Sequence, residues 1–278
     1  MIEILKAILF GIIEGITEWL PISSTGHMIL LNQFVKIEPE EFWQMFEVVI
    51  QFGAILAVVV LFWNKLWPFT SKKKNDSHSV FKPGSLAMWL KIIVACIPAA
   101  VVGLIFDDKI DELFYHPIPV AIALIVVGII FILIESIKGK NVKARVNSID
   151  EISYKDAILI GLFQLIAAIF PGTSRSGATI IGGLVIGLSR EIAAEFTFFL
   201  AVPVMFGASL LKIVKFAVSA EAVITGGQIA VLLTATAVAF LVSILVIKFL
   251  MDYIKKHDFK PFGIYRIILG IIVIAILH

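Results

Sequence analysis

The stretch Pro171-Gly172-Thr173-Ser174-Arg175-Ser176-Gly177-Ala178-Thr179 interrupts a segment that is otherwise apolar enough to be buried in a membrane. It brings together one arginine, four hydroxyl side chains and two glycines. An arginine inside a bilayer is costly, which indicates that Arg175 is kept there for binding. Hydroxyl groups and backbone amides at the glycine-permitted start of a helix form a cradle for an anion. The stretch therefore predicts a helix break with an anion site.

A related stretch, Pro21-Ile22-Ser23-Ser24-Thr25-Gly26-His27, follows two glutamates, Glu14 and Glu18, near the start of the chain. The apolar segments around the two stretches, 4–31 and 156–187, each carry proline, glycine and polar residues at their middle. Each segment therefore predicts a re-entrant hairpin made of a helix, a break and a second helix. Broken helices at corresponding places in two halves of a membrane protein mark a transport or active site.

The composition predicts an all-α integral membrane protein that forms a single domain over 1–278. Hydrophobic residues make up 60% of the chain and charged residues 16%, whereas a soluble domain is about a quarter charged. The net charge of +2 is too small to indicate a nucleic-acid partner. Besides the two hairpins, six apolar segments are long enough to span a membrane. They are 43–63, 88–106, 117–136, 192–212, 227–250 and 263–277.

The two halves of the chain are copies at an offset of 150 residues. Ser24 thereby becomes the counterpart of Ser174. Each copy contains one broken hairpin and three spans, with repeat 1 over 1–136 and repeat 2 over 156–278. Because three is odd, the second copy must be inverted in the membrane. The identical pairs are Ala7 and Ala157, Ile8 and Ile158, Leu9 and Leu159, Gly11 and Gly161, Ile16 and Ile166, Pro21 and Pro171, and Ser24 and Ser174.

Charge is distributed unevenly among the loops. The loops 64–87, 137–155 and 251–262 are rich in lysine, whereas the loop 107–116 is acidic. Basic loops stay in the cytoplasm, so 137–155 is predicted to be a cytoplasmic linker between the repeats. The first hairpin then enters from outside and the second from the cytoplasm. Non-helical backbone at membrane depth survives only against protein or in a wet cavity, so the two breaks are expected to meet in one site.

Glu14 and Glu18 lie four residues apart on one face of the predicted helix, where like charges repel. Burying both carboxylates in ionised form requires compensation by a divalent cation, a shared proton or an arginine. Carboxylate oxygens suit Mg²⁺ or Ca²⁺. The alternative is that the pair faces the outer surface near the membrane boundary. Glu47, Gln51 and Gln164, the last being the repeat counterpart of Glu14, are candidate supporting residues.

Ser24 and His27 lie three residues apart at the start of the second helix of the first hairpin. A serine beside a base is the pattern of an activated nucleophile, and His27 would serve as the general acid or base. The alternatives are that Ser24 only caps the helix and that His27 is a hydrogen-bonded core histidine.

Arg175 carries a planar fork of donors that matches the oxygens of a phosphate. Ser174, Ser176 and Thr179 lie on the same helix start and are the other candidate phosphate ligands. The alternative is that Arg175 forms a structural salt bridge with one of the two glutamates.

The segments 11–27 and 171–179 closely resemble the two signature motifs of bacterial undecaprenyl-diphosphate phosphatases of the bacitracin-resistance type, and the segment 46–51 is also similar to that family. The likeness extends over essentially the whole chain. It implies dephosphorylation of undecaprenyl diphosphate to the monophosphate lipid carrier of cell-wall synthesis, in the bacterial plasma (inner) membrane. It also implies a divalent cation, an active site that faces outside, and a homodimer. In that family the residues tied to activity match Glu14, Glu18, Ser24, His27 and Arg175.

The expected chemistry is metal-assisted phosphate hydrolysis. Glu14 and Glu18 would hold the cation on the diphosphate, and Arg175 with the neighbouring hydroxyls would clamp the terminal phosphoryl group. Ser24 or a water would attack while His27 moves the proton. The alternative function is a transporter or flippase for a lipid phosphate or another anion, because broken helices in inverted repeats are a transporter architecture. A third, a serine–histidine membrane hydrolase of esters or peptides, is disfavoured by the arginine and the paired glutamates.

Overall fold

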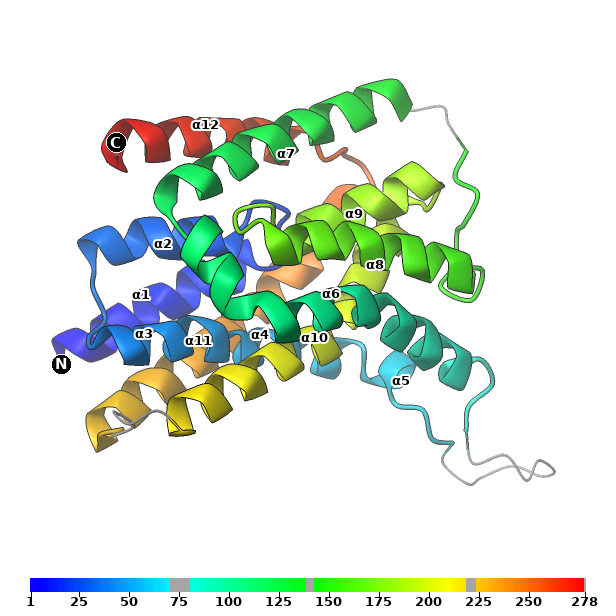
Figure 1. Cartoon of the computed structure of the whole chain (residues 1–278). Helices are drawn as coiled ribbons and strands as arrows, with labels where there is room; N and C mark the ends of the chain where they lie inside the picture. The colour runs from blue at the N-terminus through cyan, green and yellow to red at the C-terminus, as the bar shows by residue number, and fades with distance from the viewer. Residues whose placement is uncertain (71–80, 139–142, 219–223, 278) are drawn as a thin grey trace.

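The computed structural model describes residues 1–70, 81–138, 143–218 and 224–277, and in these ranges the chain forms α-helices and no β-strand (Figure 1). The all-α prediction is confirmed for this part of the chain. The helices are α1 (Ile2–Thr17), α2 (Ser24–Phe34), α3 (Glu40–Val49), α4 (Gln51–Leu61), α5 (Trp63–Leu66), α6 (Ser85–Phe114), α7 (Pro117–Lys138), α8 (Tyr154–Ile169), α9 (Arg175–Ile186), α10 (Arg190–Val218), α11 (Gly226–Ile254) and α12 (Lys260–Leu277).

Among the described residues, five helical segments are long and apolar enough to cross a membrane. Four of them lie in α6, α7, α10 and α11, and the fifth is formed by α3 and α4, which are separated only at Ile50. They correspond to five of the six spans expected from the sequence. The sixth expected span, 263–277, lies in α12, which packs along α7. Long apolar helices in such number are typical of a multi-pass membrane protein.

The helix pairs α1–α2 and α8–α9 are hairpins that open at opposite ends of the molecule (Figure 1). Lys6, at the start of α1, donates a hydrogen bond to the backbone oxygen of Lys36, just after α2. At the other end, the backbone N–H of Arg145 donates to Gly187, which follows α9, and the Arg145 side chain forms an ion pair with Asp156 of α8 at 2.6 Å. Each predicted helix–break–helix segment is therefore present.

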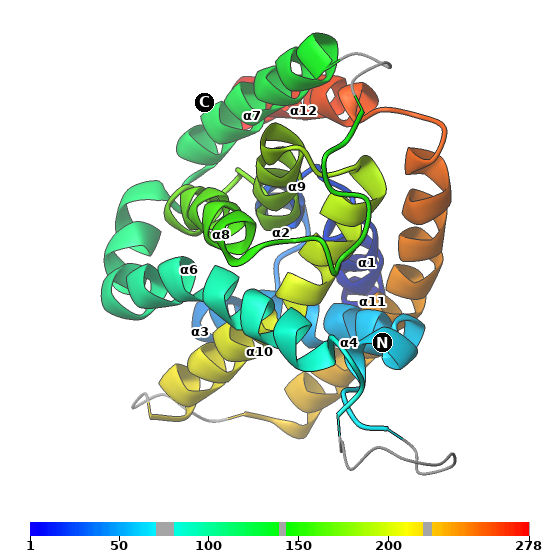
Figure 2. The same cartoon turned by 90° about the vertical axis from the view of Figure 1, so that its right-hand side faces the viewer.

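The first helix of each hairpin lies against a long helix from the other half of the chain. Figure 2 shows α1 beside α11 and α8 beside α6. Glycine permits both approaches, because a Cβ atom at Gly11 would lie 2.6 Å from the carbonyl oxygen of Ala235, and one at Gly161 would lie 2.6 Å from that of Ala95. Close packing of neighbouring helices therefore explains why glycine occupies both matched positions of the repeat, Gly11 and Gly161.

The second helix of each hairpin starts at a serine in a strained backbone conformation. Ser23 and Ser174 have φ angles of 73° and 70°. Their side-chain oxygens accept hydrogen bonds from the backbone N–H groups of Gly26 and Gly177, which satisfies a free amide at each helix start. Ser23 is thus the structural counterpart of Ser174, and the pairing of Ser24 with Ser174 from the sequence is wrong.

One additional residue explains this shift in register. The turn that precedes α9 is one residue longer, counted from its proline, than the turn that precedes α2. Gly172 occupies the longer turn with a φ of 92°, and a Cβ atom there would lie 2.5 Å from the carbonyl oxygen of Val120, so the position requires glycine. With the capping serines matched, the counterpart of Arg175 is Ser24.

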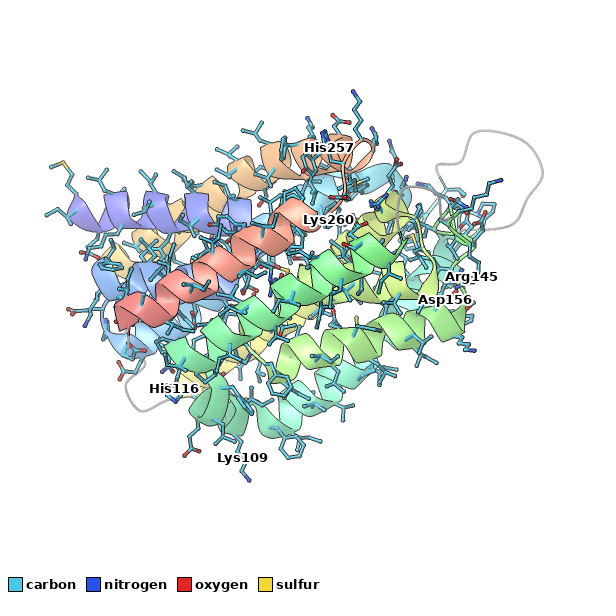
Figure 3. The ribbon with its side chains drawn as sticks, turned by 90° about the horizontal axis from the view of Figure 1, so that it is seen from above. Lys109, His116, Arg145, Asp156, His257 and Lys260 are labelled. Carbon is cyan, nitrogen blue, oxygen red and sulfur yellow. The ribbon has the colours of Figure 1, made fainter. Side chains whose placement is uncertain are left out.

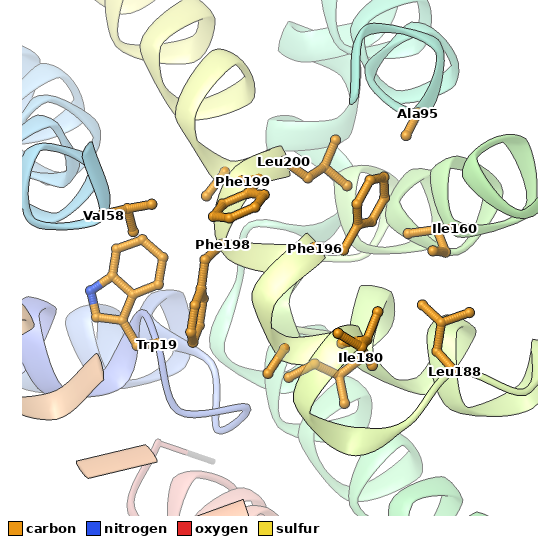
Figure 4. Packing of buried hydrophobic residues seen from close by; sticks show 14 of the residues in the cluster. Trp19, Val58, Ala95, Ile160, Ile180, Leu188, Phe196, Phe198, Phe199 and Leu200 are labelled. Atoms are coloured by element: carbon orange, nitrogen blue, oxygen red, sulfur yellow. The ribbon is translucent and has the colours of Figure 1, made fainter. Parts of the chain in front are cut away.

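An aromatic core supports the first break. Trp19, which follows α1, is fully buried, and its ring meets the ring of Phe198 edge-on with 5.3 Å between centroids (Figure 4). Phe196 and Leu200, also on α10, belong to the same buried cluster. The chain that leaves α1 is therefore fixed against α10.

Charged residues mark the two ends of the helix bundle (Figure 3). Lys109 and His116 lie at one end, and Arg145 and His257, from predicted cytoplasmic loops, lie toward the other. The segment 107–116, which the sequence predicted as a loop, is instead helical as far as Phe114, the last residue of α6. The parts of these basic loops at 71–80 and 139–142 lie outside the described residues.

Candidate active site

The two helix breaks are in direct contact. Arg175, the first residue of α9, donates from Nη2 to Oε1 of Glu18 at 2.8 Å. Ser176 Oγ donates to the backbone oxygen of Glu18 at 3.0 Å. These hydrogen bonds join residues 157 and 158 positions apart in the sequence, and they confirm that the breaks meet in one place.

Arg266 of α12 connects the two helix breaks through hydrogen bonds to backbone oxygens of both. Its Nη1 donates to the backbone oxygen of Pro21 at 3.2 Å, and its Nη2 donates to those of Gly172 and Thr173 at 2.8 and 2.9 Å. The side chain is fully buried. Sequence reasoning missed this residue, although an arginine within an apolar segment is the same signal that singled out Arg175.

The guanidinium of Arg175 is held on several sides. Besides Glu18, it donates from Nη1 to the backbone oxygen of Thr197 at 2.9 Å and from Nη2 to Met205 Sδ at 3.4 Å. Its Cζ lies 5.9 Å from the centroid of the Trp19 ring, within cation–π range. The salt bridge considered from the sequence is present, and its partner is Glu18. A phosphate can take the place of that carboxylate because both offer paired oxygens to the fork.

Ser24 shares the same carboxylate. Its Oγ donates to Oε2 of Glu18 at 2.5 Å, while Oε1 accepts from Arg175. A carboxylate that already holds the hydroxyl hydrogen is placed to act as a general base. Glu18 therefore stands between the candidate nucleophile and the candidate phosphate ligand.

His27 is turned away from Ser24. Its Nδ1 lies 2.7 Å from the backbone oxygen of Ser23, and its Nε2 lies 2.7 Å from the hydroxyl of Tyr265 on α12. The rings of His27 and Tyr265 also stack, with 5.6 Å between centroids. Because both ring nitrogens are engaged elsewhere, the His27 ring does not contact Ser24 as a base would. This placement matches the alternative of a hydrogen-bonded histidine.

The three predicted hydroxyl ligands differ in position. Ser174 lines the cavity in front of Arg175, and its Oγ lies 3.1 Å from Ser176 Oγ. Ser176 and Thr179 are buried. Thr179 Oγ1 donates to the backbone oxygen of Arg175 at 2.9 Å and accepts from Thr197 Oγ1 at 2.8 Å. Ser176 and Thr179 therefore brace the start of α9, and Ser174 is the hydroxyl that faces open space.

Two adjoining cavities lie in front of these groups. The small cavity, of about 180 Å³, is lined by polar side chains that include Glu18, Ser24, Gln51, Gln164, Ser174 and Arg175. The large cavity, of about 690 Å³, is lined by Glu14, Ser24, Glu47, Gln51, Tyr115 and Lys212 among others. Ser24 and Gln51 border both cavities, so Ser24 lies where they join.

Glu14 is fully buried, and neither of its carboxylate oxygens has a hydrogen-bond partner. Since Glu18 is also buried, the alternative of an exposed glutamate pair is wrong. Glu47 accepts a hydrogen bond from the Tyr115 hydroxyl at 2.6 Å. Gln164 donates to the backbone oxygen of Ala95 at 3.5 Å, and its own Oε1 is buried without a partner.

The buried carboxylates provide some, but not all, of the ligands that a divalent cation needs. Within the described ranges, no group of three or more His, Cys, Asp or Glu side chains is arranged to hold a metal by itself. Both oxygens of Glu18 are bonded to Ser24 and Arg175. The unpartnered carboxylate of Glu14 suits a cation such as Mg²⁺, which commonly takes one or two protein carboxylates and completes its shell with substrate phosphates and water.

Comparison with known proteins gives a consistent result. The family model described as bacitracin resistance protein BacA matches residues 7–272. An undecaprenyl-diphosphatase of Desulfitobacterium hafniense is 59% identical over 276 residues, which cover 99% of this chain and 96% of that protein. Undecaprenyl-diphosphatase 1 of Clostridium acetobutylicum is 60% identical, with coverage of 99% and 97%. An undecaprenyl-diphosphatase of Enterococcus faecalis is 55% identical, again with coverage of 99% and 97%.

Proposed function

The chain belongs to the bacitracin resistance protein BacA family, and on this premise we propose that it hydrolyses undecaprenyl diphosphate to undecaprenyl phosphate and inorganic phosphate. This reaction recycles the lipid carrier of cell-wall synthesis. One observation carries the proposal: Glu18 accepts hydrogen bonds from both Arg175 and Ser24, and all three residues line the same cavity. A guanidinium, a carboxylate base and a hydroxyl are groups that phosphoanhydride cleavage can use.

Substrate binding begins with an exchange at Arg175. The terminal phosphoryl group presents its oxygens to the guanidinium fork and takes the place of the Glu18 carboxylate. Ser174, which faces the same cavity, would turn its hydroxyl hydrogen from Ser176 Oγ to this group. Donors fixed in this way stabilise the charge that develops in the transition state.

Ser24 is the nucleophile in this proposal. Its Oγ forms a bond to the terminal phosphorus as the bond to the bridging oxygen breaks, and undecaprenyl phosphate leaves with the bonding electron pair. Glu18, released from Arg175, takes the proton of the hydroxyl it already binds. Water then cleaves the phosphoserine and releases inorganic phosphate. Direct attack by water is the alternative, and it forms no phosphoserine.

A divalent cation, Mg²⁺ or Ca²⁺, would neutralise charge on the diphosphate when bound. Glu14 would hold it, because its buried carboxylate has no partner in the protein. Oε1 of Glu18 would be open to the cation once Arg175 has turned to the substrate, whereas Oε2 faces Ser24. Glu47 borders the same cavity as Glu14, and its carboxyl group accepts a hydrogen bond from Tyr115.

His27 has a positioning role in this scheme. Its hydrogen bonds to Ser23 and Tyr265 fix the start of α2 against α12. Proton transfer to or from Ser24 would first require the His27 ring to leave both partners. The hydrogen bond from Ser24 to Glu18 already provides the shorter path for the proton.

The proposed topology is a pair of inverted repeats, 1–136 and 156–278, joined by a cytoplasmic linker at 137–155. Three observations support it: hairpins that open at opposite ends, matched serine caps, and the exchange of helix neighbours through Gly11 and Gly161. The large cavity reaches the acidic end of α6, at Asp111 and Glu112, so the site would face outside the bacterial plasma membrane. Homodimer formation stays a prediction from the family resemblance.

Phosphate release in detergent tests the proposal. Purified full-length protein is expected to release inorganic phosphate from undecaprenyl diphosphate, and Ser24→Ala is expected to release almost none. Absence of release by the unaltered protein would contradict the hydrolase and favour the lipid-phosphate transporter considered above. Such a transporter is not favoured at present, because the similar proteins are named as diphosphatases.

A further inference from the structure

Gln164 of α8 and Glu14 of α1 occupy matched positions of the two repeats. Both side chains are buried, and in each of them a carbonyl or carboxylate oxygen has no hydrogen-bond partner in the protein. They border different cavities, because Glu14 lines the large one and Gln164 lines the small one. In the function proposed above Glu14 receives a cation, whereas Gln164 receives no ligand.

The direction of the Gln164 amide is determined by α6. Its Nε2 donates to the backbone oxygen of Ala95 at 3.5 Å, so the NH₂ group faces that helix. Helix α8 comes this close because Gly161 has no side chain, and a Cβ atom there would lie 2.6 Å from the same oxygen. Ala95 and Ile160, from the two helices, belong to one buried cluster (Figure 4). Oε1 is therefore the part of a fixed amide that remains for a ligand.

The chemistry of Oε1 selects a donor. A buried acceptor without a partner is unfavourable. The oxygens of a phosphoryl group are themselves acceptors, so a phosphate at Arg175 does not satisfy Gln164, whereas the O–H group of a water does. The small cavity, of about 180 Å³, exceeds the roughly 30 Å³ that one water occupies, so it can hold a water beside the phosphoryl group.

Gln164 and Ser24 border the small cavity at different places. Ser24 lies where the two cavities join, whereas Gln164 lines only the small cavity, away from that junction. A phosphoryl group that is bonded to Ser24 and held by Arg175 therefore has the serine oxygen on the side of the large cavity. Hydrolysis of a phosphoserine requires a water on the opposite side of phosphorus, in line with the bond that breaks. A water bound to Gln164 meets this requirement.

We propose, on the basis of the function proposed above, that Gln164 is the positioning residue for the water that hydrolyses the phosphoserine formed at Ser24. Its Oε1 accepts one O–H of this water and directs an oxygen lone pair toward phosphorus. An uncharged amide suits this place, because a second carboxylate, like that of Glu14, would repel the phosphoryl group.

Atoms and protons balance in this step. The water oxygen forms a bond to phosphorus as the bond between phosphorus and Ser24 Oγ breaks. Glu18 returns to Ser24 the proton that it took in the first step. Both protons of the water stay on the product, which leaves as dihydrogen phosphate. Gln164 gains and loses no proton, so its contribution is orientation alone.

The ratio of the two products tests this role. Gln164→Met keeps approximately the length of the side chain and removes the amide. In the first turnover we expect one undecaprenyl phosphate per chain at close to the unaltered rate, whereas release of inorganic phosphate should slow by roughly 10²-fold, as a misplaced reactant does. Phosphoserine at Ser24 should then accumulate toward one per chain, which mass spectrometry of the acid-quenched protein measures.

Gln33→Met is the matched control, because Gln33 is an exposed glutamine of α2 and should leave both products in step. If Gln164 only supports the fold, Gln164→Met would slow both products by one factor without phosphoserine, and this result would overturn the proposal. Phosphate release at the unaltered rate would overturn it equally. Gln164→Ala leaves space for a water but no acceptor, so it should accumulate the same phosphoserine and replaces Gln164→Met where that variant does not fold.

Failure of the proposed function gives a different result, which is read without altering Gln164. Phosphate release by Ser24→Ala at the unaltered rate would refute the serine as nucleophile. Absence of phosphate release by the unaltered protein would refute the hydrolase.

Discussion

Replacing Glu14 or Glu18 with glutamine is expected to abolish most activity in both cases but to change stability in different directions. Both carboxylates are buried at the site, yet Glu18 has two bonded partners and Glu14 has none. The free energy of unfolding therefore shows which glutamate has hydrogen-bonding partners, whereas the rate of phosphate release shows which glutamate takes part in the reaction.

The magnitudes follow from these environments. The side chains of Glu18 and Arg175 are 8% and 13% exposed, and removing one partner from a buried ion pair costs about 3–5 kcal/mol. Glutamine keeps one acceptor oxygen, so the lower part of that range, about 3 kcal/mol, is expected for Glu18→Gln. Glu14→Gln removes a carboxylate buried without compensation, so the free energy of unfolding should be unchanged or higher.

The measurement is unfolding of the purified full chain in detergent, with phosphate release recorded on the same samples. Glu3→Gln, at an exposed position in α1, is the matched control and should alter neither quantity. Equal destabilisation by Glu14→Gln and Glu18→Gln would refute the assignment of Arg175 and Ser24 to one glutamate.

Three further predictions concern the scaffold, the cation and the topology. Arg266→Lys should lower kcat and destabilise the protein by at least about 1.5 kcal/mol, because a single ammonium nitrogen cannot occupy the positions of both Nη1, which donates to Pro21, and Nη2, which donates to Gly172 and Thr173; unchanged kcat would contradict its positioning role. Excess chelator should abolish phosphate release and Mg²⁺ or Ca²⁺ should restore it, whereas full turnover in chelator would remove the cation from the proposal. In a Cys96→Ala background, cysteine at Lys143 should react only from the cytoplasm and cysteine at Asp111 only from outside; labelling of both from one face would refute the inverted repeats.

Local patterns in the sequence were sufficient for the apolar parts of the helices and for the breaks, although the acidic segment predicted as a loop at 107–116 is helical as far as Phe114. A long apolar run predicts a helix by itself, and Pro171 with Gly172 marks the point where that run must stop. The rule that irregular backbone at membrane depth needs protein or a wet cavity also predicted that the two breaks meet in one site, and the hydrogen bond between Glu18 and Arg175 bears this out.

The direction in which individual side chains point could not be predicted from the sequence. Spacing placed His27 near Ser24, but the hydroxyl of Tyr265, 238 residues away, determines where the ring lies. Arg266 likewise acquires its role from partners 93 to 245 residues away. Such contacts depend on tertiary packing, which no local pattern encodes.

The repeat register failed for a different reason. A fixed offset of 150 residues cannot represent the extra residue at Gly172, so Ser24 was matched with Ser174 and not with Arg175. The capping hydrogen bonds of Ser23 and Ser174 reveal the correct match.

The central claim is that Arg175 grips the phosphoryl group that is transferred. Its most direct test is the kcat of Arg175→Lys, which keeps the positive charge beside Glu18 but loses the planar fork. Losing one such transition-state contact costs about 2.7–4 kcal/mol, or roughly 10²–10³ in rate. A folded Arg175→Lys protein should therefore show kcat reduced by about that factor, with a smaller change in KM. A near-normal kcat would leave Arg175 only its salt bridge with Glu18 and contradict the account.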